Sequence, residues 1–159
     1  MANTQSMCTS FLGELLSATH NFSSANPAQT ASTANVFKAA LYLASATVNA
    51  STTAYASSGE VSGTGYSPGG ITVTNATNPT ATNSSTTAGT GYWTPSASFV
   101  YTTVTLTTAF DCVLIYNSTN SNKAVSVHTF GSQTVTAGTF TLTMPSNTTS
   151  TALLRLATT

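Results

Sequence analysis

The sequence predicts an all-β protein: an antiparallel β-sandwich of jelly-roll-like type behind a short N-terminal helical arm. From residue 35 onward, apolar and polar residues alternate in short runs, as in strands with one buried face. Residues rich in Gly, Pro, Asn and Ser separate these runs, and no helical pattern lies between them. These observations favour one sandwich domain over residues 35–159, with residues 1–34 as the arm.

The arm carries the one good helical pattern, at residues 7–20. Its apolar residues fall on a single stripe of a helix: Met7, Phe11, Leu12, Leu15 and Leu16. Ser6 or Thr9 is the expected N-cap. Because so short a helix is marginal alone, it must dock on its own sandwich or on a neighbouring subunit. Residues 21–34, rich in Ser, Ala and Asn, are typical of a linker.

The expected strands follow in order at 35–43, 71–74, 98–108, 112–116, 125–127, 134–144 and 154–156. Residues 112–116 are continuously apolar, which is typical of a central strand buried on both faces. Gly138 predicts a turn with positive φ that divides 134–144 into two strands. Two stretches lack the alternating strand pattern: the Gly-rich residues 57–70 and a long neutral loop at 75–91.

The composition is unusually poor in charge. Only 4% of the residues are charged and the net charge is zero, whereas a typical domain is roughly one quarter charged. So neutral a composition indicates a subunit whose surface is largely covered by partners. The balanced charge argues against nucleic acid and anionic membrane as partners, since both require a surplus of Lys and Arg. We find no secretory signal and no membrane span, and expect synthesis in a reducing cytoplasm.

Few residues are suited to catalysis or to metal binding. Asp111, the only Asp, begins an apolar strand, where a structural hydrogen bond is the simpler role. Cys112 lies in the same strand far from Cys8, so we expect two free thiols. His128 is most simply a surface or interface histidine. No pair of His, Cys, Asp or Glu has a useful ligand spacing. We therefore expect no enzymatic activity, no metal and no cofactor.

The remaining candidates are interface residues. The apolar stripe of the arm is one candidate contact, formed by Phe11, Leu12, Leu15 and Leu16. Tyr92 and Trp93 form another, because aromatic residues often dominate the binding energy of interfaces. Trp93 has an equally good alternative as a side chain that fills the core.

Several motifs resemble a known family: CTSF at 8–11, ELL at 14–16, VFKAALY at 36–42, TTAY at 52–55, GEVSGTGYSPGG at 59–70 and LIYN at 114–117. The chain resembles small structural proteins of tailed-bacteriophage virions, and is most similar to head decoration (cement) proteins. The resemblance implies a β-sandwich on the outside of the capsid, whose arm lies along a neighbour. Glu60 and Tyr66 of the central motif then become a capsid-facing contact, or a tight turn with positive φ at its glycines.

The partners implied by the resemblance are the major capsid protein and further copies of this chain, as a dimer or trimer. Neck and tail subunits share the same composition. A neck or tail subunit is therefore an alternative to a capsid protein. A second alternative is an adhesin that binds the host surface, for which Tyr92 and Trp93 would form the aromatic platform.

Overall fold

The computed structural model describes residues 2–23, 34–75, 78–82 and 89–158. These residues form two antiparallel sheets and one short helix near the N-terminus, so the predicted all-β sandwich is confirmed. The larger sheet has the order β1 (Ser6–Met7), β7 (Lys123–Leu142), β6 (Phe99–Asn117), β2 (Phe37–Leu43) and β3 (Ile71–Thr72). The smaller sheet has the order β4 (Thr80–Ala81), β5 (Thr90–Trp93) and β8 (Leu154–Ala157).

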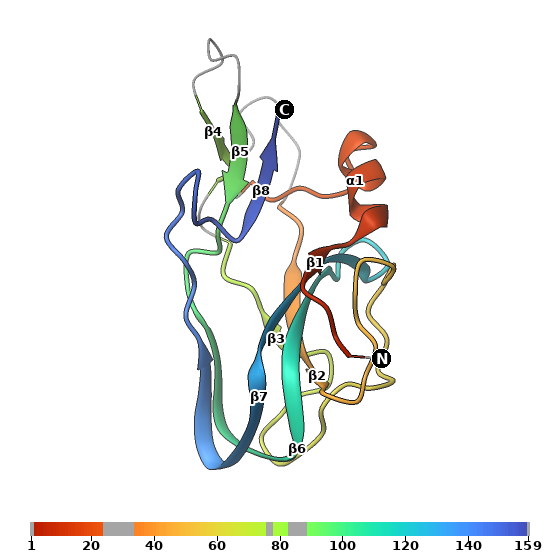
Figure 1. Cartoon of the computed structure of the whole chain (residues 1–159), viewed down its shortest axis with the longest axis vertical. Coiled ribbons are helices and arrows are strands. Elements are labelled where there is room, and N and C mark those ends of the chain that lie inside the picture. Colours follow the sequence, from red (N-terminus) through yellow and green to blue (C-terminus); the bar gives the residue numbers. More distant parts are fainter. Residues whose placement is uncertain (1, 24–33, 76–77, 83–88, 159) are drawn as a thin grey trace.

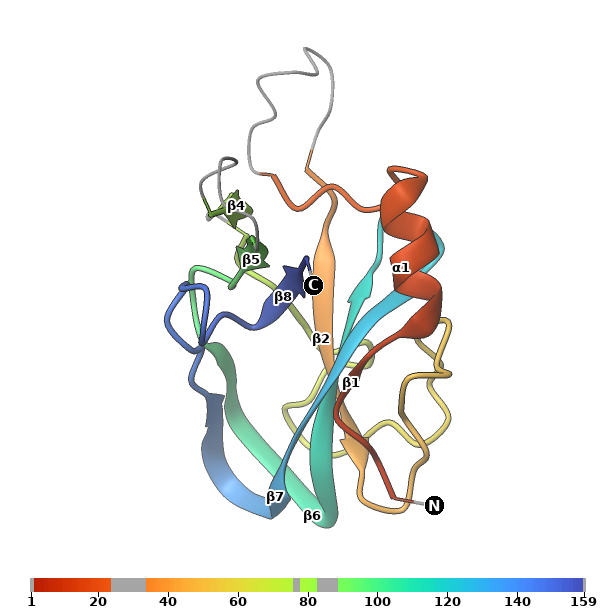
Figure 2. The same ribbon diagram turned by 45° about the horizontal axis from the view of Figure 1, so that its top comes forward.

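The second layer of the molecule arises from one long hairpin that folds back on itself. In Figures 1 and 2, β6 and β7 run side by side, turn together at the lower end and rise again. As a result Ala39 pairs with Ile115 near the end of β6, while its carbonyl accepts a 2.9 Å hydrogen bond from Tyr101 near the beginning. The pairing register shifts repeatedly between Tyr101 and Cys112, and such bulges bend strands.

This folding corrects two sequence expectations. The stretches 98–108 and 112–116 belong to the single strand β6, and 125–127 and 134–144 largely to the single strand β7. Gly138 forms no turn but lies within β7 opposite Val104. A bulge interrupts the period-two alternation just as a turn does, so the pattern does not show whether two runs are one bent strand or two separate strands. The predicted strand at 154–156 is confirmed as β8.

The core lies between the layers and centres on β2 and the second half of β6. Ala39, Ala40 and Leu41 of β2 are buried, as are Leu114 and Ile115 beside them. Burial on both faces confirms 112–116 as a central strand. Across the folded hairpin, Phe140 packs edge-on against Phe110 at 5.0 Å between ring centroids.

The helix α1 is shorter than expected, at Thr9–Leu16. Ser6 and Met7 pair with β7 as strand β1, so the chain remains extended up to the N-cap residue Cys8. Neither Ser6 nor Thr9 is the N-cap, and no side chain caps the helix. No helix in the described part of the chain is long and apolar enough to cross a membrane.

The segments expected to be loops contain further structure. Parts of 75–91 form the short strands β4 and β5, although residues 76–77 and 83–88 lie outside the described residues. The Gly-rich segment 57–70 packs along the larger sheet, and Gly59, Gly65, Gly69 and Gly70 have positive φ. At Gly70 an added Cβ would lie 1.8 Å from the carbonyl oxygen of Ala39. This close approach requires glycine.

Candidate assembly surface

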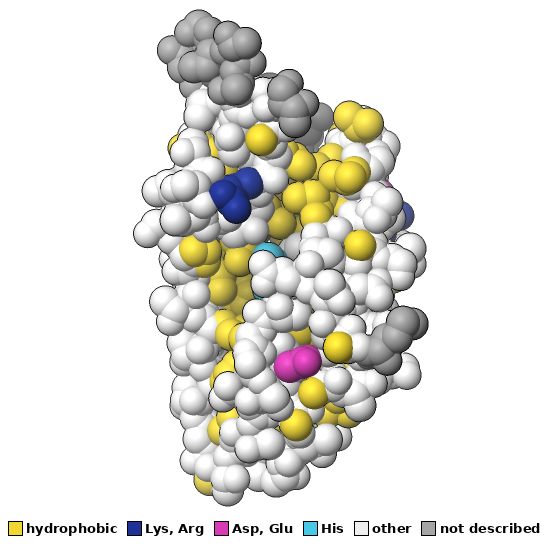
Figure 3. All heavy atoms as spheres, viewed as in Figure 1, with side chains coloured by type: hydrophobic (Ala, Val, Ile, Leu, Met, Phe, Trp, Pro, Cys, Tyr) yellow, Lys and Arg dark blue, Asp and Glu magenta, His cyan; other side chains and the backbone are white. Residues whose placement is uncertain are grey.

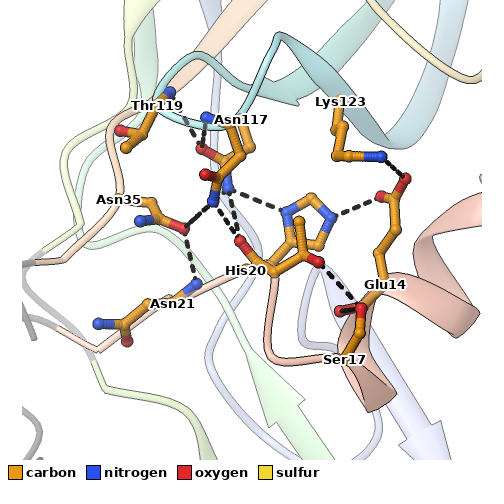
Figure 4. Close-up of polar contacts among 10 residues, drawn as sticks. Glu14, Ser17, His20, Asn21, Asn35, Asn117, Thr119 and Lys123 are labelled. Carbon is orange, nitrogen blue, oxygen red and sulfur yellow. Dashed lines mark hydrogen bonds and ion pairs between the residues drawn. The ribbon is translucent and has the colours of Figure 1, made fainter.

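A cluster of polar side chains holds the N-terminal segment on the larger sheet, and we call it the clamp: Glu14, His20, Asn35, Asn117 and Lys123 (Figure 4). Glu14 lies on α1, and its carboxylate has two partners. Lys123 Nζ lies 2.6 Å from Oε1, and His20 Nε2 lies 2.8 Å from Oε2. Because Lys123 begins β7, the Glu14–Lys123 ion pair joins the helix to the sheet.

The hydrogen bonds of His20 define its tautomer. Asn117 Nδ2 lies 3.1 Å from His20 Nδ1, and an amide nitrogen only donates, so Nδ1 is the acceptor. Nε2 therefore carries the proton and donates it to Glu14. Burial lowers the pKa of His20 and outweighs the opposing effect of the Glu14 carboxylate. The imidazole is accordingly neutral at pH 7.

Glu14 carries the negative charge of the clamp. Burial alone would raise the pKa of this carboxyl, but the hydrogen bonds from Lys123 and His20 outweigh burial and hold it below its usual range. Glu14 is thus ionised at neutral pH, paired with Lys123 and hydrogen-bonded by neutral His20.

Asn117, at the end of β6, connects the clamp to the turn before β7. Its side-chain amide donates to Asn35 Oδ1 at 2.8 Å as well as to His20. Its Oδ1 accepts the backbone N–H groups of Thr119 at 3.1 Å and Asn120 at 3.2 Å. Since Asn117 is fully buried, these contacts satisfy its polar atoms and fix the turn.

Aromatic packing beside the clamp fastens the same segment. Phe22 stacks on Phe37 of β2 with ring centroids 4.3 Å apart and lies 4.8 Å from Trp93 of β5. Phe11 of α1 packs edge-on against His20 at 4.9 Å. The described part of the arm is therefore docked on the sandwich of its own chain. Of the two places left open for the helix, the described segment takes its own sandwich, and the contact with a neighbour that the resemblance implies stays a prediction.

Two leucines of the helix face solvent. Leu12 is 48% exposed and Leu16 is 93% exposed, although both were expected on the stripe that contains buried Phe11. Successive helical residues are rotated by about 100°, so Leu12 and Leu16 stand beside the stripe that Phe11 and Leu15 form. Exposed leucines on a rigidly held helix are typical of a contact surface.

An apolar hollow of about 400 Å³ lies between α1 and the smaller sheet. Yellow side chains gather there between α1 and β8 in Figure 3. We call this feature the apolar hollow, and its main apolar lining residues are Met7, Phe11, Leu15, Phe22, Pro79, Tyr92, Trp93, Leu154 and Leu156. No Lys, Arg, Asp or Glu lines it. Leu156, 45% exposed, belongs to its rim.

A second, more polar hollow of about 470 Å³ lies on the other side of β8. Ser126, His128 and Arg155 are among its lining residues. His128 Nε2 lies 2.9 Å from the hydroxyl of Ser126, and burial lowers the pKa of His128 to about 4. An imidazole with so low a pKa is a weak proton acceptor at neutral pH, so this pair is suited to a structural hydrogen bond.

The residues expected at interfaces differ in their burial. Phe11, Tyr66 and Trp93 are core side chains, and Trp93, only 3% exposed, takes the core-filling alternative. Phe22 of the arm packs against the indole of Trp93, which accounts for this burial. Tyr92 and Leu15 are half-buried at the apolar hollow. Leu12 and Leu16 are exposed on α1 and do not line the hollow.

Glu60 lies apart from this surface and organises the Gly-rich segment. Its carboxylate accepts hydrogen bonds from the hydroxyls of Tyr55 at 2.6 Å and Tyr66 at 2.8 Å, and from the backbone N–H of Gly69 at 2.8 Å. Tyr66 in turn accepts the backbone N–H of Leu41. Glu60 and Tyr66 thus form an internal corner of the fold.

The two cysteines are free, as predicted, and both are buried. Burial, with a smaller contribution from Glu14, raises the pKa of Cys8 to about 11. Burial, with a smaller contribution from the charge of Asp111, raises the pKa of Cys112 to about 12. Both thiols are therefore protonated at neutral pH. Within the described residues, no group of three or more His, Cys, Asp or Glu side chains could hold a metal ion.

The sequence reasoning missed the clamp and Leu156. Glu14 and Lys123 are 109 residues apart, so no local spacing links them. One compositional signal was available: in a chain with six charged residues, each charge is a candidate for an internal contact. Leu156 was assigned to the last strand, but its place beside α1 follows only from the pairing of β5 with β8.

Comparisons of this chain with protein families, characterised proteins and solved structures find no match.

Proposed function

We propose that this protein is a structural subunit of a tailed-bacteriophage virion, which binds the outside of the capsid and cements neighbouring major capsid subunits. The observation that carries the proposal is the apolar hollow, together with the exposed leucines of α1 and β8. Such a surface is costly to leave in water, and it is suited to protein contact rather than to catalysis.

Two further features support a mechanical role. The clamp and the aromatic packing fix the N-terminal segment, so the contact surface is ordered before a partner arrives and little conformational entropy is lost on binding. The near absence of charge also lowers the desolvation cost of covering the surface on all sides. The phage assignment itself rests on the motif resemblance.

The proposal is tested by adding the purified protein to expanded capsids that lack it. We expect the protein to co-sediment with these shells and to raise the temperature at which they release DNA. Absence of binding would contradict the proposal. Binding confined to the portal vertex would contradict the cement role and favour a neck subunit.

A further inference from the structure

The strand β8 is an edge strand of the smaller sheet, and part of its backbone points away from that sheet. Residues of an antiparallel ladder bond alternately towards one neighbour and towards the opposite side. Just beyond the last pair of β5 and β8, the backbone N–H of Thr158 donates to the carbonyl of Gly89 at 2.9 Å. By alternation from this bond, Leu156 also bonds to β5. Arg155 and Ala157 therefore direct their N–H and C=O groups away from β5.

The pairing of β5 with β4 leads to the same assignment. The carbonyl of Thr90 accepts the backbone N–H of Thr82 at 3.1 Å, so Thr90 bonds towards β4. Its successor Gly91, which lies opposite Leu156, then bonds towards β8. The outward groups of β8 have no strand beside them among the described residues. An unpaired strand edge of this kind is a template for a further strand.

The polar hollow lies along this free edge. Arg155 and Ala157 line the hollow, and a strand added to β8 would enter its volume of about 470 Å³. Gln5, Ser6 and Ser126 are among the other lining residues. Their amide and hydroxyl groups can satisfy the polar atoms of an incoming segment that face away from β8.

The charges around the edge narrow the sequence of that segment. Arg155 is the only Lys, Arg, Asp or Glu that lines the polar hollow. Its guanidinium donates to the carbonyl oxygen of Ser150, and no carboxylate of the described residues pairs with it. An acidic residue opposite Arg155 would lie on the same face and form an ion pair. The residues on either side of the acidic one would lie beside Leu154 and Leu156, which line the apolar hollow, so apolar side chains fit there.

A second copy of this chain does not offer such a strand. Its three acidic side chains, those of Glu14, Glu60 and Asp111, are all engaged in internal contacts. We infer that the free edge of β8 binds an extended segment of another protein, antiparallel to β8, with an acidic residue opposite Arg155 and an apolar residue on each side of it. Strand addition depends on neither the phage assignment nor a capsid, so its failure and the failure of shell binding are separate results.

The test titrates the isotope-labelled full chain with a blocked peptide, acetyl-Ser-Val-Asp-Val-Ser-amide, and follows the backbone amide signals by NMR. Two further peptides carry Asn or Lys in place of the Asp. Two others are N-methylated, one at the Asp and one at the Val before it. The Asp would exchange both backbone hydrogen bonds with Arg155, whereas the Val would direct its N–H away from β8. Methylation of the Val is therefore the matched control for methylation of the Asp.

We expect saturable binding, with the largest signal shifts at the amides of Arg155 and Ala157. The Asp peptide should bind about two- to fivefold more tightly than the Asn peptide, and more tightly still than the Lys peptide. N-methylation of the Asp should weaken binding by about fivefold or more, because it removes a hydrogen bond, and N-methylation of the Val should change little.

Three variants of the chain assign the contacts. Arg155→Gln should abolish the preference for Asp over Asn, and Lys38→Gln is the matched control, because Lys38 carries the same charge but does not line the hollow. Ala157→Pro removes an outward N–H, which an edge strand tolerates, and should weaken binding of every peptide. Thermal unfolding verifies that each variant is folded.

Several results would overturn the inference. They are the absence of saturable binding, equal weakening by the two N-methyl groups, and a preference for Asp that survives Arg155→Gln. Self-association of the chain that Ala157→Pro abolishes would also overturn it, because the edge would then belong to a second copy.

Discussion

The three acidic side chains of this protein all have internal contacts. Glu14 pairs with Lys123, Asp111 accepts a 2.6 Å hydrogen bond from the side chain of Asn3, and Glu60 binds the hydroxyls of two tyrosines. Glu14 and Asp111 thus both tie the N-terminal segment to the sandwich. The acidic side chains thus fasten the fold, and most of the outer surface consists of hydroxyls, amides and apolar groups.

Glu14→Gln should lower the free energy of unfolding by about 1–2 kcal/mol at pH 7, because it removes the ion pair with Lys123 and weakens the bond from His20. The pKa of Glu14 is lower in the folded chain, so its stabilisation is present above the ordinary value of 4.5 and is lost as the pH falls. Urea unfolding at several pH values measures both effects. A difference between the two proteins that stayed constant down to pH 3 would contradict this account.

Like Glu14, the two histidines should make the folded protein less stable as the pH falls. The pKa values of His20 and His128 are lowered from 6.5 by burial, so below that pH the unfolded chain binds protons more readily than the folded chain. Stability is therefore expected to fall as the pH drops from 6.5 towards 4, where His128 titrates in the fold. Equal melting temperatures at these two pH values would contradict the prediction.

Gly70→Ala should destabilise the protein by about 3 kcal/mol or more, because φ is +72° and the new Cβ would overlap the backbone of Ala39. Gly13→Ala is the matched control. Gly13 lies within α1 and an added Cβ meets nothing within 4 Å, so alanine should stabilise by about 0.5–1 kcal/mol. Chemical denaturation separates the two variants. Equal stability of both would contradict the close approach at Gly70.

At the scale of elements, the N-terminal segment is part of the sandwich. β1 extends the larger sheet, and Phe11 and Phe22 belong to the same core as Phe37 and Trp93. The helix and its flanking residues therefore cover a region of the core that would otherwise face water. The exposed side of α1, which we propose as part of a contact surface, is held in place by this packing of its buried side.

Phe22→Ala should lower the free energy of unfolding by about 3–5 kcal/mol, since the ring fills the space between Phe37 and Trp93. It should also let water reach the indole of Trp93 and shift its fluorescence to longer wavelength. Phe22→Leu keeps most of the apolar volume and is the control. An unchanged emission spectrum for Phe22→Ala would contradict the packing described.

The elements also show what the sequence can predict. Alternating apolar residues located most of the strands, and the continuous run at 112–116 correctly indicated burial on both faces. The folded hairpin was missed, because bulges between Tyr101 and Cys112 bend β6 without ending it. The clamp was missed because its partners meet only through the fold. Trp93 was ambiguous because its burial depends on Phe22, which is 71 residues away.

At the scale of the whole molecule, the neutral surface determines how association should respond to salt. Contacts made by apolar and hydroxyl groups lack the screened Coulomb energy that weakens with ionic strength. Self-association should therefore change little between about 0.05 and about 1 M NaCl, or strengthen slightly. Sedimentation equilibrium across this range is the measurement. A steep weakening with added salt would indicate charged contacts instead.

The central claim is that the chain is a structural subunit of a virion shell. If the claim holds, the most direct test is quantitative mass spectrometry of purified particles of its phage, which counts copies of this chain relative to the major capsid protein. A cement protein is expected in hundreds of copies, in a fixed ratio to the major capsid protein, because it follows the symmetry of the shell. Absence from the particle, or only about a dozen copies as in a single ring, would contradict the claim.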